Sequence, residues 1–249
     1  MHNPYFFELK RTLRTLLALS VTAATLASCE NTTDAGPELG REYYPLAVGA
    51  YRIYDVADTS YSNFTATIQR YQYKEKDSTL VTDAAGLPAY QVVRYRRAAR
   101  NEPWRFDSVL LVTPTAQALQ VQRSNLRTVE LVFPVREGRT WNQNAFNSRD
   151  SITAETRFYN RVNQPFTYSN GSRQFSYNET VTTSNLFGRG EVNLFYATVR
   201  RAVYAKGVGL VYRVRRDFAF CDNSPGCIPN ASRPNSGRSR WEVLVESGK

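Results

Sequence analysis

The chain has 249 residues, and its 32 lysines and arginines outnumber its 22 aspartates and glutamates, giving a formal net charge of +10. His2 is the single histidine, and it lies almost at the N-terminus. Because the sequence after His2 contains no histidine, it excludes Ser–His–Asp and Cys–His catalytic systems and ordinary histidine-ligated zinc or copper sites. We predict no catalytic residue, no metal site and no cofactor.

The first 28 residues have the order of a secretory signal peptide. Lys10, Arg11 and Arg14 form a positive segment, and a mildly apolar run follows as far as Ala27. That run is too short, and too interrupted by Ser and Thr, to cross a hydrocarbon core of ~30 Å. The alternative is an amphipathic first helix that carries a cysteine by chance.

The end of this segment, Leu26-Ala27-Ser28-Cys29, closely resembles the lipobox of bacterial lipoproteins. The resemblance implies cleavage before Cys29 and attachment of diacylglycerol to its thiol. One acyl chain holds a protein only marginally on a membrane, but two or three hold it stably. Glu30 stands where enterobacterial proteins retained in the inner membrane have Asp, so the resemblance implies the outer membrane. It leaves open whether the domain faces the periplasm or the cell exterior.

Residues 29–42 are polar and acidic and contain Gly and Pro, which predicts a flexible tether. We expect residues 43–249 to form one domain, since about 200 residues is a normal length for a single β domain. Two short helices are the only helical candidates, one near 39–43 and one within 184–195.

From residue 43 onward, β-forming residues dominate. The first predicted strands are 51–56 and 63–73, and in the second Tyr71 and Tyr73 share one face while Ile68 and Arg70 take the other. Short turns separate further predicted strands at 89–97, 104–112, 118–123, 126–133, 151–159, 173–183, 198–205, 210–220 and 240–246. Because no long helical pattern intervenes, the sequence predicts an all-β domain with an antiparallel sheet, either a sandwich or a half-barrel.

Two further cysteines, Cys221 and Cys227, flank a segment that contains Asn-Ser-Pro-Gly. These residues favour turns and can bring the two Cα atoms within ~6 Å, and an exported compartment permits oxidation. We predict a disulfide between them. The alternative is a two-thiolate metal site, which lacks further soft ligands nearby.

Three stretches resemble a poorly characterised group of Bacteroidota outer-membrane lipoproteins. They are YYPLAVGAYRIYDV at 43–56, FPVREGRTWNQN at 133–144 and VYAKGVGLVYRVRRDF at 203–218. The resemblance implies an exported β-rich fold. It carries over no catalytic residue, because the shared motifs belong to turns and core strands.

The predicted function is therefore a non-enzymatic, lipid-anchored envelope lipoprotein with a ligand-binding or structural role. Its partners would be the membrane, through Cys29, and an envelope protein, a glycan or a lipid, but not nucleic acid. One alternative is a carrier or receptor for an apolar ligand, similar to the LolA/LolB-type carriers at the level of fold only. The other is a hydrolase that uses carboxylates such as Asp107, Asp150 and Glu155.

Two compositional features leave the ligand open. The excess of arginine fits an anionic partner outside the cytoplasm, such as lipid phosphates or acidic glycans, and it also fits a genome rich in G and C. The many tyrosines are expected to pack in the core. Glycan or lipid binding gains support if several of them line one open concave face, the candidates being Tyr71, Tyr73, Tyr95, Tyr159 and Tyr168.

Overall fold

The computed structural model describes residues 38–147, 152–171, 173–185, 191–221, 227–228, 230 and 232–249. The chain divides into two compact units, Met1–Glu38 and Leu39–Lys249. The predicted signal peptide and Cys29 lie outside the described residues, and the second unit begins four residues before the domain boundary expected at 43. Within the described ranges, no helix has the length and apolar character needed to span a bilayer.

The second unit is built from antiparallel β-strands, as predicted. A single 3-10 turn, η1 (Arg41–Tyr43), precedes them. The strands are β1 (Tyr51–Ser62), β2 (Thr65–Thr82), β3 (Pro88–Arg97), β4 (Arg105–Pro114), β5 (Ala118–Arg123), β6 (Leu126–Val132), β7 (Thr140–Asn142), β8 (Thr156–Asn170), β9 (Arg173–Ser184), β10 (Glu191–Val192), β11 (Tyr196–Ala205), β12 (Gly209–Ala219) and β13 (Ser236–Gly248).

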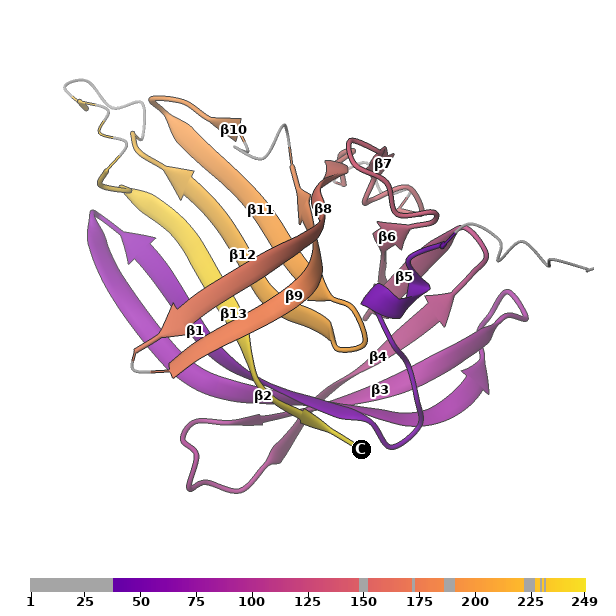
Figure 1. Ribbon diagram of the computed structural model, residues 1–249. Helices are drawn as coiled ribbons and strands as arrows, with labels where there is room; N and C mark the ends of the chain where they lie inside the picture. The colour runs from indigo at the N-terminus through magenta and orange to yellow at the C-terminus, as the bar shows by residue number, and fades with distance from the viewer. Residues whose placement is uncertain are drawn as a thin grey trace, which may run out of the picture. The chain divides into compact units, whose positions relative to one another are not determined.

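These strands form one sheet that curls into a nearly closed barrel (Figure 1). Its hydrogen-bonded order is β6-β5-β4-β3-β2-β1-β13-β12-β11-β9-β8-β7, with β10 beside β11. Where the two ends approach, the Val129 N–H of β6 donates to the Gln143 carbonyl just after β7, at 2.9 Å. The Trp141 indole N–H of β7 donates back to the Val129 carbonyl, also at 2.9 Å. The structure is therefore a curled sheet of the half-barrel kind and not a sandwich.

The side chain of Tyr159 strengthens this approach of the two ends. Tyr159 lies on β8 and is fully buried. Its hydroxyl accepts the Val132 N–H of β6 and donates to the Val132 carbonyl, both at 2.7 Å. A tyrosine hydroxyl thus satisfies two backbone groups of β6 that have no strand partner on that side.

Strand alternation decides which residues fill the barrel. Tyr71 and Tyr73 of β2 are buried inside, whereas Ile68 and Arg70 lie on the outer face, as the alternation within 63–73 predicts. The apolar interior is completed by residues from several strands, among them Tyr54, Val56, Val92, Leu110, Val112, Val121 and Leu131. Charged residues share this interior, and the sequence analysis did not anticipate them.

The strand β8 extends well beyond the predicted range of 151–159, whereas β9 matches the predicted strand 173–183 to within one residue. Their pairing register shifts between Asn160 and Gln164 and again between Gln164 and Phe166. Beyond these irregularities the two strands form a hairpin arm, which we define as 164–171 and 173–179. Figure 1 shows β8 and β9 crossing β12 and β13. The Tyr212 ring of β12 lies 5.4 Å from the Phe166 ring and 5.1 Å from the Tyr168 ring, so the arm packs on the outer face of the barrel.

The two predicted helices had different outcomes. The first region holds η1, whose Tyr43 is buried and whose hydroxyl bonds to the Asn163 side chain. The prediction of a helix within 184–195 is wrong for the described part, where β9 ends at Ser184 and β10 spans Glu191–Val192. There the Asn193 side chain accepts the N–H groups of Phe195 and Tyr196, which turns the chain back into β11.

Candidate functional site

A cleft of about 420 Å³ opens at the end of the barrel where β5 turns into β6 and β11 begins. We call it the mouth cleft. Residues of β5, β6, β8, β11 and β12 line it together with the segment that joins β7 to β8. Its charged lining consists of four arginines and two carboxylates, and polar side chains surround them: Arg123, Arg157, Arg200, Arg215, Glu155, Asp217, Thr128, Gln143 and Asn144.

Strand period places these charges inside the barrel. Arg213, Arg215 and Asp217 alternate along β12 and therefore share its inner face. Arg213 is paired in register with Glu242 of β13, so the guanidinium and the carboxylate lie next to each other on one face. The Arg213 Nη1 and Glu242 Oε2 atoms are 3.3 Å apart.

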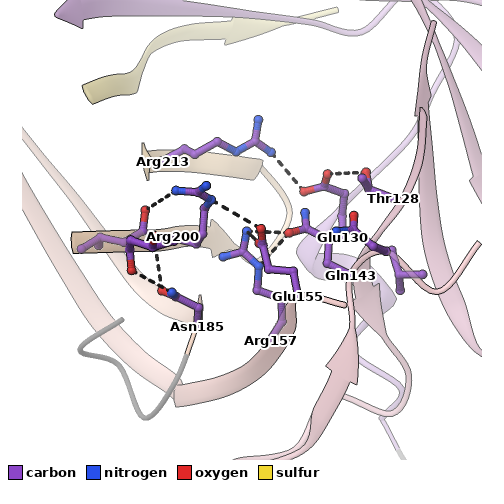
Figure 2. A network of polar contacts seen from close by, with 12 residues as sticks. Thr128, Glu130, Gln143, Glu155, Arg157, Asn185, Arg200 and Arg213 are labelled. Carbon is purple, nitrogen blue, oxygen red and sulfur yellow. Dashed lines mark hydrogen bonds and ion pairs between the residues drawn. The ribbon is translucent and has the colours of Figure 1, made fainter. Parts of the chain in front are cut away.

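Glu130 of β6 is the centre of the buried charge network beneath the mouth cleft (Figure 2). Its Oε1 atom accepts the Thr128 hydroxyl at 3.0 Å and an Arg123 N–H at 3.2 Å. Its Oε2 atom accepts the Tyr204 hydroxyl at 3.2 Å and an Arg213 N–H at 3.3 Å. Four donors thus satisfy one carboxylate that is 5% exposed.

The protonation of Glu130 follows from this environment. Burial alone opposes ionisation, but the charges of Arg213 and Arg123 outweigh it and hold the pKa of Glu130 well below its usual value. Burial likewise opposes ionisation of Glu75 and Glu242, and arginines again lower the pKa of each. The buried carboxylates are therefore ionised at neutral pH.

A second cluster lies closer to solvent, around Glu155 (Figure 2). Glu155 lies 2.6 Å from the Arg157 guanidinium and 3.5 Å from that of Arg200. The Gln143 side-chain oxygen accepts two N–H groups of Arg157, at 2.7 and 2.6 Å. Arg200 also donates to Asp217 at 2.6 Å. Each carboxylate at the mouth is therefore held by arginine.

Asn185 fixes the backbone at this edge. Its side chain accepts the Arg200 N–H at 2.8 Å and donates to the Thr198 carbonyl at 2.9 Å. These bonds continue the β9–β11 pairing just beyond the end of β9, and they hold the start of β11 against the cleft. Arg200 is thereby positioned by its own main chain as well as by its ion pairs.

Arg215 differs from the other arginines of the cleft. Among the described residues it makes no hydrogen bond or ion pair, although it lines the mouth cleft from the inner face of β12. Burial and the adjacent charge of Arg213 lower the pKa of Arg215 to about 10. It remains a cation at neutral pH, largely desolvated and without an acceptor.

This arrangement suits the binding of an anion better than chemistry on a substrate. Guanidinium groups present planar pairs of donors that match carboxylates and phosphates. A general acid would need a carboxyl group with a raised pKa, yet the buried carboxyls here have lowered ones. The described ranges contain no cluster of three or more His, Cys, Asp and Glu residues suited to a metal ion.

The structure joins the two cysteines of the predicted disulfide, but it forms no cluster of the described candidate carboxylates. Cys221 and Cys227 form a disulfide with their Cα atoms 5.8 Å apart, in the loop between β12 and β13. Of the three candidate carboxylates, Asp107 is exposed on β4, Asp150 lies outside the described residues, and Glu155 lies in the mouth cleft. No pair of them forms a hydrolytic site in the described part of the chain.

The five candidate tyrosines do not gather on one open face. Tyr71, Tyr73 and Tyr159 are buried inside the barrel, Tyr95 is half-buried on β3, and Tyr168 lies on the arm. Core packing therefore accounts for most of them. The arginines were the informative residues, and the one signal available was the alternation of arginine with Tyr and Val along 212–215.

Comparison with known proteins adds little. No protein-family model matches the chain, and no curated protein matches it. Among solved structures, a candidate lipoprotein from Parabacteroides distasonis aligns with a TM-score of 0.33 and 10% sequence identity, over 83% of this chain and 98% of that one. Similarity at this level supports no conclusion about the function of this chain.

Proposed function

We propose that the chain is a lipid-anchored envelope lipoprotein that binds a small anionic ligand in the mouth cleft and catalyses no reaction. The observation that carries the proposal is Arg215, a largely desolvated guanidinium with no acceptor among the described residues. A ligand carboxylate or phosphate would supply that acceptor. Neighbouring Arg123, Arg157 and Arg200 line the same cleft and would add to the attraction.

The physical advantage of this site is that folding has already removed part of the water around the half-buried Arg215 guanidinium. Charge-assisted hydrogen bonds are stronger where the local dielectric constant is low, and a preformed site loses little entropy on binding. The Arg123 and Arg157 side chains are tied to Glu130 and Gln143, which limits their movement. The cleft is therefore largely organised before the ligand arrives.

The two alternative functions gain less support. A carboxylate hydrolase needs two carboxyls with different protonation states, whereas Glu155 and Asp217 at the mouth are each paired with arginine. A carrier of an apolar ligand needs a hydrophobic cavity, whereas the interior of this barrel holds a network of ionised Glu and Arg residues. We therefore favour the binding of a small anion, and nucleic acid is not among the proposed partners.

The lipid anchor at Cys29 is the second part of the proposal, and the sequence from Leu26 to Cys29 supports it. Intact-mass measurement of the membrane-extracted protein should give a chain that starts at Cys29 and carries acyl groups. A Cys29→Ser variant should keep its leader and lose acylation. A wild-type protein recovered with its leader intact and its thiol free would contradict the anchor.

Titration calorimetry of the full-length protein in a non-ionic detergent tests the ligand class. Citrate and inorganic phosphate serve as probes of the free anion, and glycerophosphoglycerol, the deacylated form of phosphatidylglycerol, tests a lipid headgroup. We expect binding of at least one probe, weakened by salt, and at least about tenfold weaker in Arg215→Met, the equivalent of roughly 1.4 kcal/mol. Arg105→Met, at an exposed position on β4, is the matched control. Equal affinities of wild type and Arg215→Met would overturn the proposal.

A further inference from the structure

A second recess lies on the outside of the barrel, away from the mouth cleft. It encloses about 510 Å³ between the outer face of β1, β2 and β13, the turn after β3, and the tip of the β8–β9 arm. None of the residues that line it lines the mouth cleft. We call it the arm groove. Its size lies within the range of small-molecule sites, roughly 300–1,000 Å³.

Asp55 joins the two walls of the arm groove. Its Oδ2 atom accepts an N–H of Asn170 at the arm tip and an N–H of Arg100 in the turn after β3, each at 3.3 Å. Its Oδ1 atom accepts the Gln72 side-chain amide from the floor at 2.5 Å. Both 3.3 Å contacts are long and involve partly exposed groups, so a ligand hydroxyl can replace either one.

Two further polar groups line the groove without a partner. Within the described ranges, neither the exposed guanidinium of Arg70 nor the hydroxyl of Tyr168 makes a hydrogen bond or ion pair. Arg70 comes from the floor on β2, and Tyr168 comes from the arm. Together with Asp55 and Arg100 they offer donors and acceptors from three sides of one recess.

The remaining lining is apolar and partly aromatic. Trp241 of β13 and Tyr168 of the arm both pack against Tyr212, at 5.9 and 5.1 Å between ring centroids. Ile68 is 54% exposed on the floor and adds aliphatic surface to the groove. The groove therefore pairs an aromatic and aliphatic surface with several polar groups.

We propose that the arm groove is a carbohydrate-binding site, separate from the anion site in the mouth cleft. A sugar ring has an apolar face of C–H groups and a rim of hydroxyls that donate and accept. The aromatic side chains of Trp241 and Tyr168 can pack against the C–H face of the ring. The side chains of Asp55, Arg70 and Arg100 can form hydrogen bonds with its hydroxyl groups. Among the described residues, Asp55 already pairs with Arg100, which leaves Arg70 as the one unpaired charge among these side chains, and a sugar hydroxyl can accept its N–H groups.

An extended peptide is the competing occupant, and the sheet disfavours it. Peptides that bind to β-sheets commonly add a strand to a free edge and bond through their main chain. The floor of the arm groove consists of β1, β2 and β13, whose neighbours in the sheet already satisfy their backbone groups. Only side chains face the recess. Side chains can recognise the hydroxyl groups of a sugar, but they cannot extend the sheet with a peptide strand.

The test is two-dimensional NMR of the full-length protein in a detergent without a sugar headgroup. Maltotriose, cellotriose, xylotriose and chitotriose are the probes, and a Pro-rich peptide is the competitor. We expect at least one trisaccharide to shift the resonances of Asp55, Arg70 and Trp241 and to leave those of Arg157 and Arg215 unchanged. Asp55→Asn should weaken that trisaccharide at least fivefold, and Asp107→Asn, on an exposed part of β4, should not.

The outcomes separate this inference from the proposed function. Shifts confined to the mouth cleft, or no shift with any trisaccharide at millimolar concentration, overturn the carbohydrate site and leave the anion site standing. Shifts in the groove caused by the peptide alone assign it to peptide recognition and also overturn the proposal. Arg70→Ala lies on the exposed outer face, so it offers a second variant should Asp55→Asn unfold the arm.

Discussion

Arg213 of β12 and Glu130 of β6 are 83 residues apart in the sequence, yet their side chains meet across the barrel at 3.3 Å. The same guanidinium reaches Glu242 at 3.3 Å, so one arginine joins three strands through two carboxylates. The interior of this barrel is thus held by ion pairs as well as by apolar packing, and this property leads to several measurable expectations.

Glu130→Gln should destabilise the fold strongly, because the change leaves Arg213 and Arg123 without their shared anion. Removing one partner of a buried ion pair costs roughly 3–5 kcal/mol. Urea unfolding gives the free energy directly. Glu102→Gln, in the exposed turn after β3, should change it by less than about 0.5 kcal/mol. Equal effects of the two substitutions would contradict the network.

Arg213 and Arg215 should respond in opposite ways to the same substitution. Arg213→Met leaves Glu242 buried without its ion pair and leaves Glu130 with Arg123 as its one arginine partner, at a cost of roughly 3–5 kcal/mol. Arg215→Met removes a desolvated cation without an acceptor and should leave stability unchanged or raised. Parallel urea unfolding of both variants checks this. A loss in Arg215→Met as large as that in Arg213→Met would show that Arg215 has a structural partner.

The free energy of unfolding should decrease in acid, because the buried carboxylates become protonated and lose their ion pairs. The pKa values of Glu75, Glu130 and Glu242 are lowered in the folded state from an ordinary value of 4.5. Their contribution is therefore fully present above pH ~4.5 and is lost as the pH falls through the folded values. Thermal unfolding between pH 7 and pH 2 measures the loss. Glu130→Gln should flatten the dependence, and an unchanged slope would exclude Glu130 as a contributor.

The arm should detach when its aromatic contact is removed. Tyr212→Ala deletes the ring that packs against Phe166 and Tyr168, and large-to-small core changes of this kind cost roughly 3–5 kcal/mol. Limited proteolysis should then cleave within 164–179 faster than in the wild type. Phe106→Ala, at a side chain 67% exposed on β4, is the control and should leave the cleavage rate unchanged.

The strands were largely predictable and the site was not. Alternation in 63–73 correctly put Tyr71 and Tyr73 on the opposite face from Ile68, because period two is a local property. The second strand of the arm lies within the predicted strand 173–183. The first strand of the arm was missed because β8 continues past two irregularities, where alternation fails. The Glu130–Arg213 pair depends on the closure of the sheet, and a single sequence holds no local signal for a contact over 83 positions.

The approach of β6 to β7 has a mechanical consequence. A cylinder whose strands are bonded all the way round has a fixed circumference. Here the ring of strands is interrupted between β6 and β7. A main-chain hydrogen bond between Val129 and Gln143 connects the two ends there, together with hydrogen bonds from the side chains of Trp141 and Tyr159. Gln143 also lines the mouth cleft. The entrance of the cleft therefore lies beside the joint between β6 and β7, where few hydrogen bonds hold the barrel wall together. We therefore expect local opening of the barrel to begin at this joint, while the rest of the sheet keeps its pairing.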